Sequence, residues 1–139
     1  MQQANKSVGL WIETSEAPTP MGSYSQGRRS GQTLYTSGQI GLDSNTLKLV
    51  DGIEAQIRQS FANIKAICEA GGATLDCITK LTVFLVEKED WVHVNRIMEE
   101  LFDNGYPART AVGVVWLPLG AAVEIEAVAE IPADRALLD

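Results

Sequence analysis

The chain has 139 residues, of which 45% are hydrophobic, 18 are acidic and 11 are basic, so its formal net charge is −7. This length and composition are typical of one globular domain, which we expect over residues 1–139 with a flexible tail over 132–139. The acidic balance disfavours partners held through phosphates, such as nucleic acids or anionic membranes, because binding them requires clustered Lys and Arg.

The first part of the chain predicts β-structure interrupted by prolines. We expect a short strand over 8–12, followed by a connector over 17–22 whose two prolines cannot donate to a strand ladder. Two β-prone runs follow over 24–29 and 33–40, and the polar turn between them predicts a hairpin. Residues 41–52 have the composition of a loop.

Two later segments have the periodicity of amphipathic helices. The first helix is expected over 53–70 and ends at Gly71-Gly72, since glycine can adopt a left-handed cap. Its apolar face consists of Ile53, Ile57, Phe61, Ile64 and Cys68. The second is expected to begin at Asp90, whose carboxylate can cap the first amides, and to end before Gly105 and Pro107. Its apolar face consists of Val94, Ile97, Met98, Leu101 and Phe102.

Three further strands are expected, one over 78–86 between the helices and two over 110–115 and 122–129 after them. This order indicates an α+β domain in which both helices pack on a single face of one sheet. Apolar side chains on the opposite face would have to be covered, and we expect a second copy of the chain to cover them in a closed homo-oligomer.

Most common catalytic motifs are absent, including the phosphate-binding loop, the dinucleotide fingerprint and the Gly-x-Ser-x-Gly nucleophile elbow. His93 is the single histidine and is interpreted as a partly exposed residue of a helix face. We therefore expect no metal and no organic cofactor. Cys68 and Cys77 lie in apolar stretches without a CxxC spacing, which indicates reduced core residues. No signal peptide or membrane span is recognised, so a cytoplasmic protein is expected.

Three charged residues stand out in the C-terminal strands. Arg109 begins a strand, where its guanidinium could bind a carboxylate through two parallel hydrogen bonds; alternatively it is a solvent-facing charge at a sheet edge. Glu124 and Glu126 share one side of the last strand because side chains alternate with a period of two. They could serve chemistry, or they could simply form the hydrated face of the strand.

Small polar residues also occupy strand positions where Val or Ile would pack better. Tyr24 precedes one such run, and Ser37 and Gly38 lie in another, where glycine would let a ligand approach the backbone amide. An ordinary turn or bulge would explain both runs equally well. Asn95 could point into a pocket from the second helix or could be a surface residue.

Together these residues resemble the RidA/YjgF family of enamine and imine deaminases. The resemblance covers most of the chain. It is carried by Gly22-Ser23-Tyr24-Ser25-Gln26-Gly27, Thr36-Ser37-Gly38-Gln39, the helical segment 56–64, Val94-Asn95, Tyr106-Pro107-Ala108-Arg109, Leu117-Pro118 and Val123-Glu124-Ile125-Glu126-Ala127. Its most specific part is the pairing of Arg109 with Glu124 fifteen residues later, without a gap.

The resemblance implies a homotrimer of chorismate-mutase-like subunits, each a mixed six-stranded sheet with two helices on one face, and ligand clefts between subunits. By the same resemblance, Arg109 would bind a substrate carboxylate, assisted by Ser37 and the Gly38 amide. Glu124 would activate water, and Tyr24 would enter the cleft from the neighbouring chain. Asn95 would line the cleft, as would Ala111, which stands where many members carry a cysteine.

The implied activity is that of a 2-iminobutanoate/2-iminopropanoate deaminase, which hydrolyses reactive enamines and imines to 2-keto acids and ammonia. An imine carbon is already electrophilic, so the reaction needs positioning and proton transfer but no cofactor. A glutamate near its reference pKa of about 4.3 is ionised at neutral pH and can accept the proton. A nearby guanidinium would keep it ionised.

Other functions were weighed against this one. A non-catalytic trimer that binds a small carboxylate for regulation would use Arg109 equally well, but it gives Glu124 no purpose. A ribonuclease fits poorly with the acidic composition and the lack of a histidine pair. Ser23, Thr110 and Trp116 also depart from the residues common in the family, which bears on substrate identity more than on the type of reaction.

Overall fold

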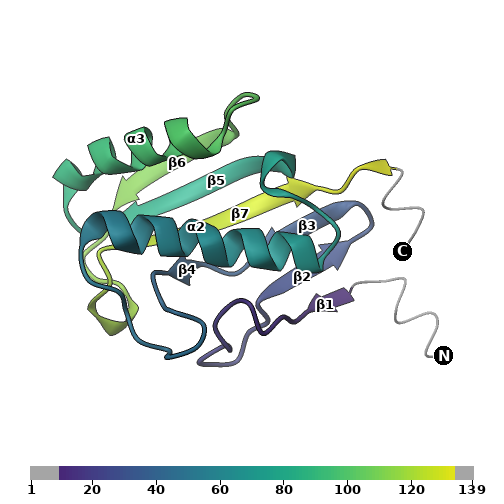
Figure 1. The fold of residues 1–139 in the computed structure, drawn as a ribbon, viewed down its shortest axis with the longest axis horizontal. Coiled ribbons are helices and arrows are strands. Elements are labelled where there is room, and N and C mark those ends of the chain that lie inside the picture. Colours follow the sequence, from purple (N-terminus) through teal and green to yellow (C-terminus); the bar gives the residue numbers. More distant parts are fainter. Residues whose placement is uncertain (1–9, 134–139) are drawn as a thin grey trace.

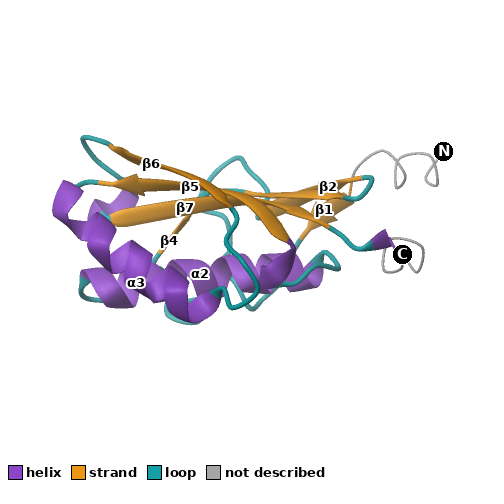
Figure 2. Ribbon diagram, turned by 90° about the horizontal axis from the view of Figure 1, so that it is seen from above, coloured by secondary structure: helices purple, strands orange, loops and turns teal. Residues whose placement is uncertain are grey.

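A single twisted sheet with two helices on one of its faces forms the whole fold (Figures 1 and 2). The structure is a computed structural model that describes residues 10–133. Its elements run in the order β1 (Leu10–Ile12), β2 (Gly27–Ser30), β3 (Thr33–Thr36), β4 (Gln39–Ile40), α2 (Ile53–Ala70), β5 (Ile78–Leu85), α3 (Trp91–Leu101), β6 (Ala108–Gly113) and β7 (Val123–Glu130). None of the helices in the described range is long and apolar enough to cross a membrane.

The sheet is mixed, as the sequence predicts. Its strands follow the order β1-β2-β3-β7-β5-β6, and the short β4 pairs with β7 beside β3, which makes seven strands where the resemblance implied six. Only β5 and β6 run parallel; the other pairs are antiparallel. The parallel pair requires a crossover, and α3 supplies it. Residues 8–9 of the first predicted strand and 134–139 of the predicted tail lie outside the described residues.

The predicted hairpin is present, but its second arm is not one strand. The run over 33–40 divides into β3 and β4 at Ser37 and Gly38, which pair with no neighbouring strand. Instead, the Ser37 amide donates to the Gln26 carbonyl at 2.9 Å, and its hydroxyl donates to the Ser25 carbonyl at 2.5 Å. These two hydrogen bonds take the place of strand pairing, and the strand is interrupted at the two residues that the sequence singles out.

Both predicted helices are present, and one expected cap is wrong. Asp90 precedes α3 in a short 3-10 turn (Lys88–Asp90) with helical backbone angles, and its carboxylate makes no capping hydrogen bond. The cap is unnecessary because the turn already continues into the helix. At the end of α2, Gly71 has a φ of −94°, whereas Gly72 adopts the positive φ of 97°.

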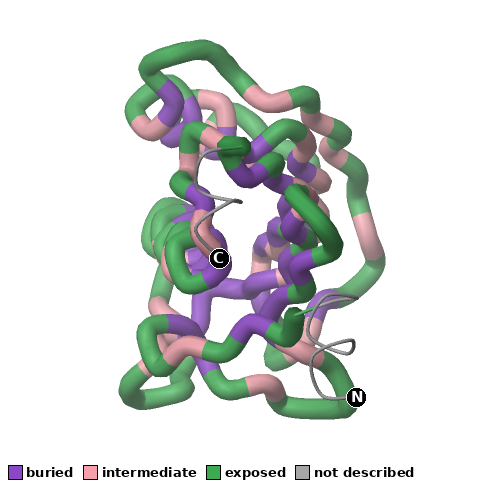
Figure 3. The backbone as a smooth tube through the Cα atoms, turned by 90° about the vertical axis from the view of Figure 1, so that its right-hand side faces the viewer, coloured by how far each residue is buried: buried purple, intermediate pink, exposed green. Residues whose placement is uncertain are grey.

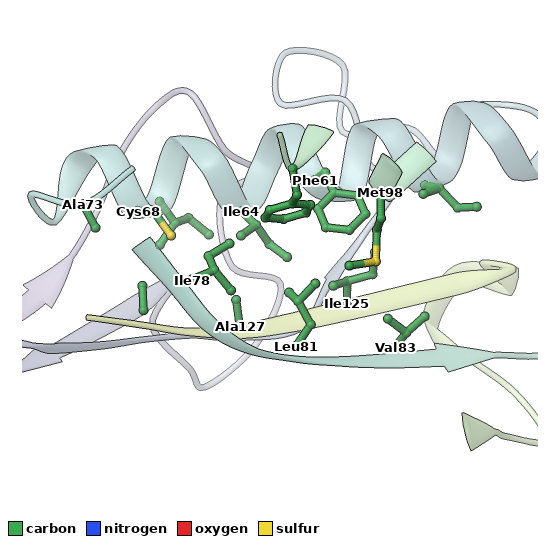
Figure 4. Packing of buried hydrophobic residues seen from close by; sticks show 14 of the residues in the cluster. Phe61, Ile64, Cys68, Ala73, Ile78, Leu81, Val83, Met98, Ile125 and Ala127 are labelled. Atoms are coloured by element: carbon green, nitrogen blue, oxygen red, sulfur yellow. The ribbon is translucent and has the colours of Figure 1, made fainter. Parts of the chain in front are cut away.

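The core lies between the helices and the sheet. Phe61 of α2 meets the ring of Phe102 edge to face, with their centroids 5.9 Å apart, and both rings are buried. In Figure 4, Phe61, Ile64 and Met98 point from the helices towards strand residues that include Leu81 and Ile125. In Figure 3 the buried parts of the chain lie mainly where the two layers face each other.

Within residues 10–133, no helix or further layer covers the other face of the sheet (Figure 2). Along β7, Val123, Ile125 and Ala127 are buried, whereas Glu124 is half-buried and Glu126 exposed, so the predicted alternation of this strand is confirmed. The open face mixes exposed apolar and charged side chains. On β1 and β2, for example, the Arg28 guanidinium lies 4.4 Å from the centre of the Trp11 ring.

Candidate functional site

A cavity of about 280 Å³ opens beside the junction of β4 and β7. Glu124 projects into it from β7, where it pairs with Ile40 of β4. The lining is mostly apolar with a few polar groups, a composition common in small-molecule sites. It consists of Pro18, Thr19, Met21, Tyr24, Ser37, Gly38, Gln39, Ile40, Leu42, Pro118 and Glu124. Tyr24, Ser37, Gly38 and Glu124 therefore line one cavity of one chain, whereas the resemblance implied that Tyr24 comes from the neighbouring chain.

Gly38 is packed directly against the Glu124 carboxyl group. A Cβ placed on Gly38 would touch the Oε2 oxygen of Glu124 and would lie 2.8 Å from its Cδ, closer than such atoms approach in folded proteins. The break between β3 and β4 therefore leaves exactly the room that this side chain occupies. Any larger residue here would displace the Glu124 carboxyl group, and this close approach, rather than a positive φ, is what favours glycine at position 38.

The environment of Glu124 raises its pKa above the ordinary value of 4.5. The main cause is burial, which disfavours the charged form, and the Glu126 carboxylate on the same strand face adds to it by repulsion. The sequence-based expectation of a pKa near the reference value is therefore wrong for this chain. A carboxyl group whose pKa lies closer to neutrality exchanges protons more readily in both directions, as a general acid–base group must.

Tyr24 borders the same cavity from the connector before β2. Its hydroxyl accepts a hydrogen bond from the Met21 amide at 3.2 Å, and 46% of the residue is exposed. Gln26, which is buried, holds this connector in place. Its amide oxygen accepts from Thr14, and its nitrogen donates to backbone carbonyls that include that of Pro18, at 2.9 Å.

Arg109 lies in a second depression, of about 410 Å³, between β6 and α3. Its Nη1 donates to the Oδ1 atom of Asn95 at 2.7 Å and lies 3.4 Å from the Sδ atom of Met98. The guanidinium also lies 5.5 Å from the centre of the Trp91 ring. Tyr106, Pro107 and Glu99 complete the lining. Arg109 is thus a partly buried residue with several partners, and the alternative of a solvent-facing edge charge does not describe it.

One chain does not bring Arg109 and Glu124 together. Strand β5 lies between β6 and β7, with Leu81 opposite Arg109 and Phe84 opposite Glu124. Moreover, Arg109 reaches the helix side of the sheet, whereas Glu124 alternates with residues that face the helices. Within a single chain, therefore, Arg109 is not assisted by Ser37 and Gly38.

The structure also shows where Ala111 and His93 lie. Ala111 lines neither cavity; it is half-buried beside the core. His93 lies on the surface of α3, 3.0 Å from the Nη2 atom of Arg96 and 3.9 Å from a carboxylate oxygen of Glu54, as a helix-face histidine. Among residues 10–133, no three His, Cys, Asp or Glu side chains are grouped so that they could hold a metal ion.

Sequence reasoning missed Trp91 and Met98. Both contact the guanidinium, and with Asn95 they occupy the same face of α3 at spacings of four and three residues. Met98 belongs to the apolar face that the sequence predicts for this helix, and it is buried. A helical wheel centred on Asn95 would have shown the three side chains on one face, but not which strand residue they meet.

Comparison with known proteins finds relatives that match most of the chain. A family model described as Endoribonuclease L-PSP matches residues 14–131. A 2-iminobutanoate/2-iminopropanoate deaminase of Dermatophagoides farinae is 42% identical over 121 residues, which cover 86% of this chain and 94% of the relative.

Two solved structures are similar over nearly the same region. RidA from an Antarctic Psychrobacter species has 43% identity and a TM-score of 0.86, with 88% of this chain and 99% of that chain covered. Escherichia coli TdcF with bound serine has 36% identity and a TM-score of 0.86, with the same coverage of both chains.

Proposed function

The chain belongs to the RidA/YjgF family, and on that premise we propose that it is a 2-iminobutanoate/2-iminopropanoate deaminase. The observation that carries the proposal is the pair of separate cavities, one built around a carboxylate-binding group and the other around a half-buried acid–base group. The description of a deaminase relative at 42% identity supports this activity. The serine bound to TdcF supports a small α-carboxylate as ligand.

In the proposed reaction, Arg109 holds the substrate carboxylate while water adds to the carbon of the protonated imine. As the new C–O bond forms, Glu124 accepts a proton from the water, and the electron pair of the C=N bond moves to nitrogen. Glu124 then returns the proton to nitrogen, the C–N bond breaks and ammonia leaves. The remaining hydroxyl proton passes to the departing ammonia, which leaves the 2-keto acid, so one protonated imine and one water yield one keto acid and one ammonium ion.

This mechanism requires both cavities at one substrate, and in the proposal two copies of the chain supply them. The Arg109 and Asn95 side of one copy faces Tyr24, Ser37, Gly38 and Glu124 of its neighbour, in clefts of a homotrimer. The uncovered face of the sheet supports an assembly of this kind. Sedimentation at micromolar concentration would give the mass of a trimer, and a monomeric mass would contradict this arrangement.

The activity is tested by generating 2-iminopropanoate from serine with a dehydratase and measuring ammonia release above the uncatalysed rate. We expect Arg109→Ala to raise KM at least tenfold, since a charge-assisted bidentate contact contributes roughly 1.5–3 kcal/mol. Glu124→Gln is expected to lower kcat roughly 10²- to 10⁴-fold. Arg58→Ala, which removes an exposed ion pair with Glu100, is the control and keeps wild-type activity.

Two results would overturn the proposal. One is a folded Arg109→Ala variant that hydrolyses 2-iminopropanoate as fast as the wild type. The other is a wild-type protein that binds pyruvate, the product, but does not accelerate ammonia release; that result would favour the regulatory carboxylate-binding protein instead.

A further inference from the structure

Only one of the three nitrogen atoms of the Arg109 guanidinium is engaged by hydrogen bonds of the protein. Nη1 meets both Asn95 and Met98. Within residues 10–133, no hydrogen bond from Nε or Nη2 occurs. These two nitrogens form one edge of the planar group and together offer two parallel N–H donors, the arrangement that a carboxylate accepts in a bidentate contact. The Nε–Nη2 edge of the guanidinium is therefore available to a ligand, whereas Nη1 is bonded to the protein.

A carboxylate bound through this edge requires the guanidinium plane to keep its orientation. The single Nη1 anchor to Asn95 fixes one corner but still allows the plane to rock about it. Trp91 adds a second constraint because its ring lies 5.5 Å from the guanidinium carbon, within the range of a cation–π contact. Indole is the ring that gives the strongest contact of this kind.

The sequence of α3 explains why the ring is there. Trp91 is the first residue of the helix, Asn95 follows one turn later and Met98 almost one further turn on. All three lie on the helix face that meets Arg109 of β6. Trp91 is nevertheless 49% exposed, so packing of the core does not account for an indole at this position.

We propose that Trp91 is a positioning residue for carboxylate binding, which holds the Arg109 guanidinium so that its Nε–Nη2 edge faces the substrate. The inference rests on the proposed function, because it takes the substrate to be a small 2-imino carboxylate. Trp91 acts through Arg109 and does not take part in proton transfer. Its loss should therefore weaken binding and leave the chemical step unchanged.

The test uses Trp91→Leu, Trp91→Phe and, as matched control, Val92→Ala, which alters the adjacent exposed residue of the same helix. For each folded protein, the Kd of pyruvate is measured by NMR titration of the Arg109 Nε–H signal, and KM and kcat are measured with 2-iminopropanoate. Trp91→Leu is expected to raise both Kd and KM roughly two- to fivefold, the size of an exposed cation–π contact, with kcat within about twofold of the wild type. Trp91→Phe, which keeps an aromatic face, should recover most of the affinity, and Val92→Ala should match the wild type.

The inference would be overturned by Trp91→Leu with wild-type Kd and KM, by Trp91→Phe as weak as Trp91→Leu, or by a pyruvate titration that moves no Arg109 Nε–H signal. Failure of the proposed function has a different signature, namely a wild type that binds pyruvate without hydrolysing the imine. In that case the Kd values alone still decide the role of Trp91. A loss of kcat with unchanged Kd would also contradict a role in positioning.

Discussion

Gly38 is the residue whose replacement most directly tests the cavity around Glu124. In Gly38→Ala the new methyl group would lie 2.8 Å from the Glu124 Cδ atom, so the half-buried carboxyl group must move. We expect a loss of kcat/KM of roughly one to two orders of magnitude, because misplacement of a reacting group by about 1 Å costs about that much. The fold should persist, since the colliding group is a side chain that can turn towards solvent.

Gly113→Ala is the matched control for this substitution. A Cβ on Gly113 would be 3.8 Å from the nearest atom, the Leu85 carbonyl oxygen, which is an ordinary contact. Circular dichroism and thermal melting should show both variants folded. Equal kcat/KM for Gly38→Ala and the wild type would mean that the position of the Glu124 carboxylate is irrelevant to turnover.

Glu126 sets a pH dependence that can be measured. Burial and the Glu126 charge both raise the pKa of Glu124 above 4.5, so the ionised base that accepts a proton from water is lost as the pH falls through this raised value. In the proposed cleft the neighbour's Arg109 lowers the same pKa, so the prediction concerns the shift caused by Glu126 rather than the pH at which the acid limb of kcat/KM lies. Glu126→Gln removes the repulsion but not the burial, which lowers the pKa of Glu124 and moves the limb to lower pH.

Glu130→Gln serves as the comparison, because Glu130 is on the same strand face but contacts Thr33 at the far end of β7. The profile is recorded as catalysed minus uncatalysed hydrolysis at each pH. If Glu126→Gln leaves the acid limb at the same pH or moves it to higher pH, the limb does not report the ionisation of Glu124.

The two glutamates also show what a sequence reveals about single residues. The alternation of β7 places Glu124 and Glu126 on one face, and that placement is confirmed. Their difference could not be predicted, because Glu124 lies opposite Ile40 of β4 and in a cavity that Pro18 also lines, and both residues are distant in sequence. The direction of the Glu124 pKa depends on that burial, so composition and spacing give no access to it.

Secondary-structure elements were more predictable than their ends. The strands and both helices have the expected order, since apolar periodicity reports which side of each element is buried. The predicted strand ends are wrong where tertiary hydrogen bonds, rather than the local sequence pattern, determine where a strand stops. The expected strand over 110–115 instead begins at Ala108 and ends at Gly113, in register with β5. Likewise, the uninterrupted run over 33–40 could not reveal that Ser37 bonds to the Ser25 carbonyl and splits it.

The sequence predicts α3 as a helix that packs against the sheet, and in the structure this helix also holds Arg109. Its buried face contains Val94, Ile97 and Met98, as the periodicity indicated. The neighbouring face holds Arg109 through Asn95 and Met98. Met98 belongs to both faces, which a binary division into apolar and polar sides cannot express. The Arg109 surroundings were therefore predictable in part, through Asn95 alone.

At the level of the whole molecule, the position of β5 between the two cavities leads to a test of shared sites. At substrate concentrations below the wild-type KM, Arg109→Ala alone should keep at most about a tenth of the wild-type activity, and Glu124→Gln alone about a hundredth or less. If the two chains are co-expressed and assemble at random, about a quarter of the boundaries between subunits combine an intact Arg109 with an intact Glu124. Mixed assemblies should therefore recover about a quarter of the wild-type activity, measured as ammonia release per subunit.

The control is a mixture of the two variants purified separately and combined without subunit exchange, which should show no gain in activity over the separate variants. Recovery must also be absent when the double variant Arg109→Ala/Glu124→Gln is co-expressed with either single variant. Without recovery in the co-expressed single variants, each site would belong to one chain, and the arrangement of complementary cavities on neighbouring copies would be wrong.

On the proposed function, the separation of Arg109 from Glu124 by a strand also ties turnover to dilution. A single chain would then carry two unlike half-sites and process nothing by itself, so its specific activity is expected to fall once the protein is diluted below the dissociation constant of the proposed assembly. Saturating amounts of a keto acid that contacts both subunits of the proposed cleft would stabilise the assembly. The protein concentration at which half of the activity is lost would then be lower. Output would then rise more steeply than in proportion to protein abundance, a property that a self-contained active site does not have.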